Sequence, residues 1–427
     1  MIKLKLEKLY ALQVFDSRSE PTLKVFAEAN GETASAIVPK GASTGKKEAF
    51  ELIDKKTDFD GLGVEKAASL INDKIFNLLK DIDIFKQSEI DNAMLKLDKT
   101  KYKTSIGGNT MLGVSLAISR LASKIKNIEL YKYLGGINAF TLPMPMFNVL
   151  NGGKHASNGL DIQEIMLVPV GAKTFKEAYE FGVKVYRQLK KILLEKNIST
   201  SLGDEGGFVV PFKKTSEALK LIKKATENAN LVFGKDIYIS LDVAANSFYE
   251  KGKYLFEGKN LNSLEMIDFY MQLCKKFPIL SIEDGLAEED NNWNELYKKL
   301  GKNVLIVGDD LFATNKELLA KGIKNQLANA MIIKLNQIGT LSETLETIHL
   351  ANKANVFTIV SHRSGDSEDD YIADLAVGVN SLFIKSGAPA RSERTGKYNR
   401  LLEIENELNS SSEFAGSFIR KYLVWIC

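Results

Sequence analysis

The first 135 residues alternate apolar and polar positions in the way that antiparallel strands require. The stretch TLKVFAEANGETASAIVP, residues 22–39, repeats every second residue on either side of Asn30 and Gly31. An Asn-Gly pair between two such runs predicts a β-hairpin. Helical periodicity follows at about residues 62–82 and 109–126. We therefore predict a smaller α+β domain over residues 1–135.

Beyond residue 136 the pattern changes to short apolar runs that alternate with amphipathic stretches such as SLEMIDFYMQLCKKF and TLSETLETIHLANKAN. This alternation is typical of a parallel sheet with crossover helices. Capping-box patterns at Thr314 to Glu317 and at Thr340 to Glu343 predict where two helices begin. The runs MPMFNVLN and QEIMLVPV bring the strands to eight. We predict an α/β fold, with a closed, parallel, TIM-like βα barrel over residues 136–427.

Polar and charged side chains stand at the C-terminal ends of the last six strand-like runs. They are Asp242, Glu283, Asp309, Lys334, the group His362, Arg363 and Ser364, and Lys385. Successive ends lie about 23 to 41 residues apart, which fits one strand and one crossover helix. One such charge alone is more often a solvated loop residue or a local ion pair. Six in succession indicate an active site, because barrel enzymes carry theirs on that rim.

The chemistry of this rim points to a cation and a base. Asp242, Glu283 and Asp309 form an all-oxygen set without cysteine or paired histidine, which favours a hard cation, most plausibly Mg²⁺, over zinc. Lys334 would face that cation. Cationic neighbours and desolvation lower the pKa of an ammonium and make a lysine a usable base. The residues indicate proton abstraction next to a carboxylate.

Composition excludes several other classes of protein. The 427 residues carry 57 Lys and Arg against 54 Asp and Glu, a formal net charge of +3, so there is no electrostatic footprint for nucleic acid or a membrane surface. Two cysteines form no disulfide framework. No signal-type block and no run of membrane-spanning length occurs. We expect a cytoplasmic protein without a membrane segment.

Nine motifs closely resemble those of the enolase family, in the same order and from residue 16 almost to the C-terminus. They are GASTG (41–45), LNGGKHASN (150–158), DIQE (161–164), GDEGGF (203–208), SIEDGL (281–286), GDDLFATN (308–315), KLNQIGTLSET (334–344), SHRSGDSED (361–369) and KYNRLLEIE (397–405). Motifs this long are highly specific. The resemblance implies an enolase-type barrel that dehydrates 2-phosphoglycerate to phosphoenolpyruvate, reversibly, with two Mg²⁺ ions per active site.

The resemblance also implies a role for each matching residue. Lys334 would take the C2 proton, and Glu205, assisted by Glu164, would protonate the leaving hydroxyl. Asp242, Glu283 and Asp309 would hold the first ion and Ser43, in a lid loop, the second. Further contacts with the phosphorylated substrate would come from His155, Gln163, His362, Arg363, Ser364 and Lys385. Outside this motif set, His155 would be a turn histidine and Glu205 a solvated loop carboxylate.

The chain departs from the family pattern at a few positions. DSRGNPT has become DSRSEPT with Ser19 and Glu20, and a lid serine has become Lys40. AASEFY reads AANSFY with Asn246 and Ser247, and GGFAP reads GGFVVP. None of these positions has an implied chemical role, so we expect effects on lid motion and subunit contacts rather than on the reaction.

Two other classes of function stay open on the sequence. One is a different lyase or racemase of the same superfamily, which the joint presence of GASTG, GDEGGF and SHRSG disfavours. The other is a binding module for a surface ligand or an RNA-processing assembly, which would also allow a secondary cell-surface or secreted pool. The resemblance further implies a homodimer or an octamer.

Overall fold

The N-terminal part is an antiparallel sheet covered by helices. The computed structural model describes residues 3–42, 45–55, 57–156 and 159–426. Strands β1 (Lys8–Phe15), β2 (Pro21–Ala29) and β3 (Glu32–Ile37) pair in that order. The predicted hairpin is confirmed, since β2 and β3 are joined at Asn30 and Gly31, both with positive φ. The helices of this part are α1 (Glu65–Leu70), a π-helical turn (Ile71–Ile75), α2 (Phe76–Leu79), α3 (Gln87–Asp98), α4 (Gly108–Ile125) and α5 (Leu130–Gly135).

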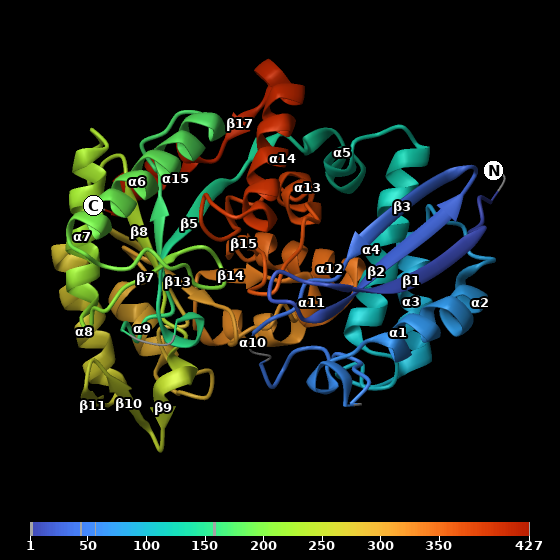
Figure 1. Ribbon diagram of the computed structural model, residues 1–427, viewed down its shortest axis with the longest axis horizontal. Coiled ribbons are helices and arrows are strands. Elements are labelled where there is room, and N and C mark those ends of the chain that lie inside the picture. The colour runs from blue at the N-terminus through green and yellow to red at the C-terminus, as the bar shows by residue number, and fades with distance from the viewer. Residues whose placement is uncertain (1–2, 43–44, 56, 157–158, 427) are drawn as a thin grey trace.

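The second part is a closed eight-stranded barrel surrounded by helices, as predicted (Figure 1). Its strands, in the order in which they pair, are β5 (Met144–Asn151), β6 (Glu164–Val168), β8 (Tyr238–Asp242), β12 (Ile279–Glu283), β13 (Leu305–Gly308), β14 (Ala330–Ile333), β15 (Phe357–Ser361) and β16 (Phe383–Lys385). The barrel closes because β16 pairs with β5. Nearly every strand residue is buried, which explains the continuous apolar runs in the sequence.

The helices outside the barrel are α6 (Phe175–Glu195), α7 (Thr215–Asn228), α8 (Ser263–Lys276), α9 (Trp293–Leu300), α10 (Lys316–Asn325), α11 (Leu335–Ile338), α12 (Leu341–Lys353), α13 (Tyr371–Gly378), α14 (Ser392–Leu408) and α15 (Gly416–Ile426). The remaining short strands are β4 (Thr141–Leu142), β7 (Phe208–Val209), β9 (Tyr249–Glu250), β10 (Lys253–Phe256), β11 (Lys259–Leu261) and β17 (Glu413–Phe414). Single 3-10 turns cover Asp58–Gly61, Gly136–Asn138, Gly153–His155, Ala245–Phe248 and Asn409–Ser411.

The expectation that all eight strands run parallel is wrong for β6. This strand pairs antiparallel with both β5 and β8. Between β5 and β6, the described residues 152–156 and 159–163 contain one 3-10 turn and no crossover helix, so β6 runs back along the barrel in the opposite direction. The first residue of β6, Glu164, therefore lies at the rim where the other strands end, opposite Asn151 and Asp242.

One of the two predicted helix caps is confirmed and the other is wrong. Thr340 caps α12 by accepting a hydrogen bond from the Glu343 amide. Helix α10 is capped by Asn315 instead of Thr314. The Thr314 hydroxyl donates to Gln337 Oε1 at 2.7 Å and accepts from the Lys334 amide at 2.9 Å. Thr314 thus supports the start of the segment that carries Lys334.

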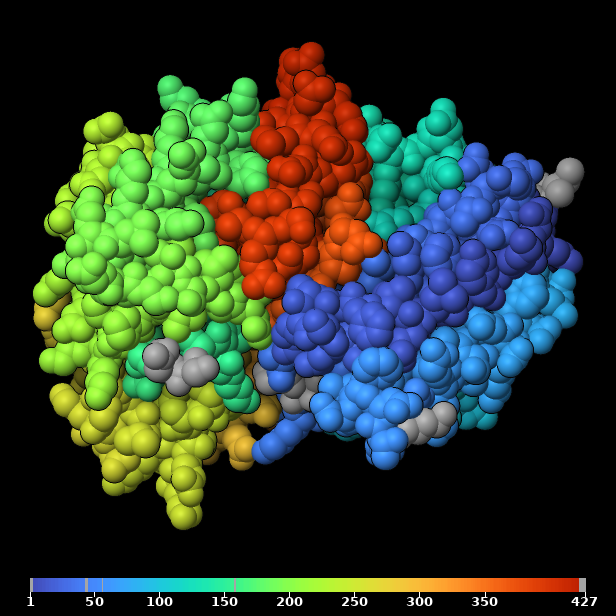
Figure 2. Space-filling model, viewed as in Figure 1, coloured from blue at the N-terminus to red at the C-terminus, as the bar shows by residue number. Residues whose placement is uncertain are grey.

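Buried polar contacts fix the N-terminal part on the barrel, and the two lie directly against each other (Figure 2). Arg120 of α4 makes a bidentate ion pair with Asp369 at 2.7 and 2.9 Å, and Asp91 of α3 accepts from the amide and hydroxyl of Ser342. Asp369 lies on the loop that follows β15, so this contact braces a loop of the barrel rim. The predicted boundary at residue 135 falls at the end of α5, which packs on α13, and its exact place remains a proposal.

Candidate active site

Side chains from both parts of the chain line one cavity at the barrel rim. Asp242, Glu283 and Lys385 end strands β8, β12 and β16. Asp309 follows β13 and Lys334 follows β14. The cavity is lined among others by Ala42, Glu48, His155, Gln163, Glu164, Glu205, Asp242, Asp309, Lys334, His362, Arg363, Ser364 and Lys385. Glu283 is not part of this lining, but it contacts Lys385, which is. Ser43 lies outside the described residues.

The Lys385 ammonium is surrounded by three carboxylates, which come from strands β6, β8 and β12. Its ammonium lies 3.1 Å from Asp242, 2.9 and 3.0 Å from the two oxygens of Glu283, and 3.5 Å from Glu164. Burial alone would lower the pKa of Lys385, but these charges, Asp242 first, raise it well above its ordinary value. Gln163 donates to Asp242 at 3.4 Å. Lys385 therefore stays charged and orders this side of the site.

Lys334 pairs with Asp309 on the neighbouring strand end. Its ammonium donates to Asp309 Oδ2, and Gln337 donates to Oδ1 of the same carboxylate at 2.8 Å. Burial alone would lower the pKa of Lys334, but the charge of Asp309 raises it above its ordinary value. The lowered pKa that a base needs is thus absent while Asp309 carries its full charge. A second cation at Asp309 would weaken this hold on the proton.

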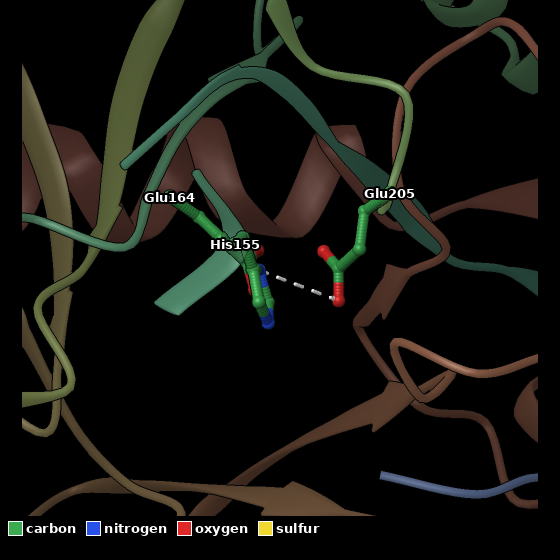
Figure 3. A group of neighbouring side chains, drawn as sticks. All are labelled: His155, Glu164 and Glu205. Atoms are coloured by element: carbon green, nitrogen blue, oxygen red, sulfur yellow. Dashed lines mark ion pairs between the residues drawn. The ribbon is translucent and has the colours of Figure 1, made fainter. Parts of the chain in front are cut away.

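Glu164 and Glu205 are two buried carboxyls close to one histidine (Figure 3). Oxygens of these two groups and His155 Nδ1 all lie within 4.8 Å of one another, and Nδ1 lies 3.8 Å from Glu164 and 3.9 Å from Glu205. Burial, and then the charge of Glu205, raises the pKa of Glu164 well above its ordinary value. The raised pKa favours the protonated form of Glu164, which is the form that a general acid needs.

His362 faces Glu205 as a neutral imidazole. Burial lowers its pKa to about 4. Arg394 donates to its Nδ1 at 2.7 Å, so the ring hydrogen is on Nε2, which lies 3.4 Å from Glu205 Oε2. Asn148 donates to the same oxygen at 3.0 Å. The hydrogen bond from Asn148 fixes the orientation of the Glu205 carboxyl, and the His362 ring lies beside it.

Arg363 and Ser364 contact the N-terminal part. The Arg363 guanidinium donates to Glu48 Oε2 at 2.9 Å and to Asn336 at 2.8 Å, and the Ser364 hydroxyl accepts from the Ala42 amide at 2.6 Å. Backbone hydrogen bonds also join Lys40 and Gly365 in both directions. Ala42 and Glu48, which lie on either side of the undescribed residues 43–44, are therefore both tied to this Arg-Ser pair.

The carboxylates at the rim fit a divalent cation. Burial, followed by the charge of Asp242, raises the pKa of Glu283 to about 8, so a cation bound beside it would favour its ionised form. The donor set is oxygen only, which hard cations prefer. A second oxygen group, not foreseen from the sequence, brings Asp284, Asp309 and Asp310 within 4.8 Å of one another. The predicted set of Asp242, Glu283 and Asp309 is not gathered within that distance among the described residues: Lys385 contacts both Asp242 and Glu283, and Lys334 pairs with Asp309.

Sequence reasoning missed several residues of this site. Asp284 accepts from the amides of Asp309 and Asp310 at 2.9 Å, and Asp310 follows a predicted ligand directly. Both belong to acidic doublets, ED and DD, and this doubling at a strand end was the available signal. Glu48, Asn148 and Arg394 have no comparable signal, because their partners are distant in the sequence.

Two departures from the family pattern contact each other. Lys40 Nζ lies 3.2 Å from Glu20 Oε2, and Arg18 pairs with the other Glu20 oxygen at 2.9 Å. A third departure, Asn246, donates to Asp310 at 2.7 Å and accepts from the Glu288 amide at 2.9 Å. The Lys40 charge is therefore compensated locally, beside the cavity.

We expect Lys40→Ser to change the apparent substrate affinity by about tenfold or less, equivalent to about 1.4 kcal/mol. The reason is that Glu20 keeps Arg18 as a partner when Lys40 is lost. Kinetics of Lys40→Ser, Glu20→Asn and the double variant measure this, and the double variant should lose less than the two single effects combined. Complete loss of activity in Lys40→Ser would contradict the expectation.

The fold and this site define a class of protein, a βα barrel whose rim gathers buried lysine and carboxyl groups in an arrangement suited to a divalent cation. The comparison with known families is specific. The model described as enolase, N-terminal domain, matches residues 6–134, and the model described as enolase, C-terminal TIM barrel domain, matches residues 139–423. The chain belongs to the enolase family. It is therefore an enzyme of the lyase type from a metal-dependent family.

Proposed function

We propose that this enzyme catalyses the reversible dehydration of 2-phosphoglycerate to phosphoenolpyruvate. One observation carries the proposal: a lysine, two neighbouring buried carboxyls and an arginine with an adjacent serine line the same cavity. The reaction needs a base for a carbon acid, an acid for a leaving hydroxyl and a phosphate contact. Family membership supports the same reaction class.

The proton transfers divide between two sides of the site. Lys334 Nζ takes the proton from C2 of 2-phosphoglycerate. The bond between C3 and the hydroxyl oxygen then breaks, and this hydroxyl takes a proton from the pair Glu205 and Glu164 and leaves as water. His155, beside that pair, contacts the leaving group, and neutral His362 lies beside Glu205.

The remaining residues bind and orient the substrate. The guanidinium of Arg363 matches phosphate geometry, and the Ser364 hydroxyl extends the contact. Lys385 and Gln163, next to Asp242, contact the substrate near its carboxylate. A deep cavity with these groups fixed by buried hydrogen bonds also excludes water from the reacting carbon.

The cofactor we propose is Mg²⁺, two ions per active site when substrate is bound. Asp242, Glu283 and Asp309 would hold the first ion, and Ser43 would contribute to the second. The ions supply Lewis-acid charge for the substrate carboxylate, whose negative charge grows when the C2 proton leaves. A lysine base combined with Mg²⁺ is an established pattern of the enolase superfamily.

The setting of the enzyme is also proposed. No helix among the described residues is long and apolar enough to cross a bilayer. We propose a homodimer or octamer in the cytoplasm that requires no nucleic acid. A secondary surface or RNA-processing partner, with a cell-surface or secreted pool, is an additional role that this site neither requires nor opposes.

An assay of phosphoenolpyruvate formation from 2-phosphoglycerate tests the function. We expect turnover with Mg²⁺, complete loss after EDTA treatment and recovery when Mg²⁺ is restored. A different superfamily lyase or racemase would act on another carboxylate substrate and leave 2-phosphoglycerate unchanged. A pure binding module would show no turnover under either condition. Full activity of the metal-free enzyme would contradict the metal assignment.

A further inference from the structure

Glu48 holds Arg363 in the way that a ligand's phosphate would. Arg363 Nη1 lies 2.9 Å from Glu48 Oε2, and Nη2 lies 3.4 Å from Oε1, so the carboxylate faces the guanidinium with both oxygens. Only 4 % of each side chain is exposed. A guanidinium binds carboxylate and phosphate through the same two-pronged geometry. The Glu48 carboxylate therefore already occupies part of the hydrogen-bonding face of Arg363, the residue proposed to bind phosphate.

Glu48 also belongs to the wall between two cavities. It lines the active-site cavity together with Arg363 and Ser364, and it lines a second cavity formed by the N-terminal part. Its Oε1 accepts from the Gly45 amide at 3.0 Å, so the carboxylate has a partner besides Arg363. A displaced Glu48 carboxylate would face this second cavity, whose lining includes Lys40 and Arg18, both paired with Glu20.

We propose that Glu48 is a positioning residue that acts as an internal anion, holding the phosphate-binding face of Arg363 in the free enzyme and giving it up when phosphorylated substrate binds. In the free enzyme Glu48 and Asn336 share Nη1 of the guanidinium and so fix its position. Substrate phosphate then competes with a like charge for one guanidinium. The inference rests on the proposed assignment of Arg363 to the substrate phosphate.

Glu48→Gln tests whether Glu48 competes with phosphate for Arg363 or only holds Arg363 in place. Glutamine keeps the length of the side chain and one acceptor oxygen but removes the charge. We expect the dissociation constant for inorganic phosphate, measured by calorimetry on the full-length enzyme without substrate, to fall about tenfold. The KM for 2-phosphoglycerate should also fall, whether kcat increases or decreases. A residue that only held Arg363 in place would give weaker phosphate binding.

Glu51→Gln is the matched control, because Glu51 lies on the same segment, lines the second cavity and acts on Arg363 by its charge alone. It should change phosphate affinity much less than Glu48→Gln. Should Glu48→Gln fail to fold, Glu48→Asp provides the same test. Its shorter side chain loses the close contact with Arg363, so this variant enzyme should also bind phosphate more tightly.

Unchanged or weaker phosphate binding in a folded Glu48 variant overturns the inference, and so does an equal effect of Glu51→Gln. The proposed function fails separately. If 2-phosphoglycerate is not turned over while Glu48→Gln still tightens phosphate binding, the substrate is wrong and the competition stands. If phosphate binds neither wild type nor variant, the role of Arg363 and this inference both fall.

Discussion

Lys334→Ala should stop both turnover and exchange of the C2 hydrogen of 2-phosphoglycerate with deuterated water, whereas Glu205→Gln should stop turnover and leave that exchange measurable. Lys334 takes the C2 proton, so without it C2 is not deprotonated and neither product formation nor exchange of the C2 hydrogen proceeds. Glu205 acts on the leaving hydroxyl, so the deprotonated intermediate still forms and regains a proton. Each loss of turnover should be about a hundredfold to ten-thousandfold.

The structure sharpens the controls for this comparison. Lys334→Ala removes the ammonium that pairs with Asp309, so part of the effect could come from the cation site. Mg²⁺ must therefore be saturating, and circular dichroism must show that each variant is folded. Lys316→Ala, which removes an exposed lysine at the start of α10, is the matched control and should be fully active. Exchange by Lys334→Ala at the wild-type rate would show that Lys334 is not the base.

The pairing of Glu205 with Glu164 gives the experiment a second arm. Because Glu164 lies within 4.8 Å of Glu205 and its raised pKa favours its protonated form, Glu164→Gln should also lower turnover and retain C2 exchange. Loss of exchange in Glu164→Gln would instead place Glu164 on the side of the base.

Asp309→Asn should weaken Mg²⁺ binding and turnover together, by about a hundredfold or more in kcat/KM at low Mg²⁺. Asp309 belongs both to the predicted ligand set and to the group formed with Asp284 and Asp310, so its loss removes a carboxylate under either arrangement. Its loss also frees Lys334 from its partner. Mg²⁺ titrations of activity and calorimetry of Mg²⁺ binding measure the two effects.

Two further variants decide which carboxylates hold the ion. If Asp242 and Glu283 complete the set, Glu283→Gln should resemble Asp309→Asn, and Asp310→Asn should be much milder. If the ion lies with Asp284 and Asp310, the order reverses. Asp284→Asn is less informative, because Asp284 also accepts from the amides of Asp309 and Asp310 and its loss disturbs both. Equal Mg²⁺ affinity in wild type and Asp309→Asn would exclude this corner as the metal site.

Much of the site could be predicted because strand ends are visible in a sequence. A buried strand is an apolar run, and the first charged residue after it marks the rim, which is how Asp242, Asp309 and Lys334 were found. Glu205 and His155 lie in loops where no periodicity applies, so only the resemblance to a family pointed to them. Ser43 falls outside the described residues and stays a prediction.

The sequence by itself determined the strands, their polar ends and the family, because hydrophobic periodicity and long motifs are local properties of the chain. Tertiary structure alone decided the direction of β6, since a buried run has the same composition whichever way it points. It also decided which charges neutralise each other. Glu48 meets Arg363 across 315 positions, and Lys385 meets Glu283 across 102. Such pairs form because burying an unpaired charge is costly, and which partner lies within reach is set only when the chain has folded.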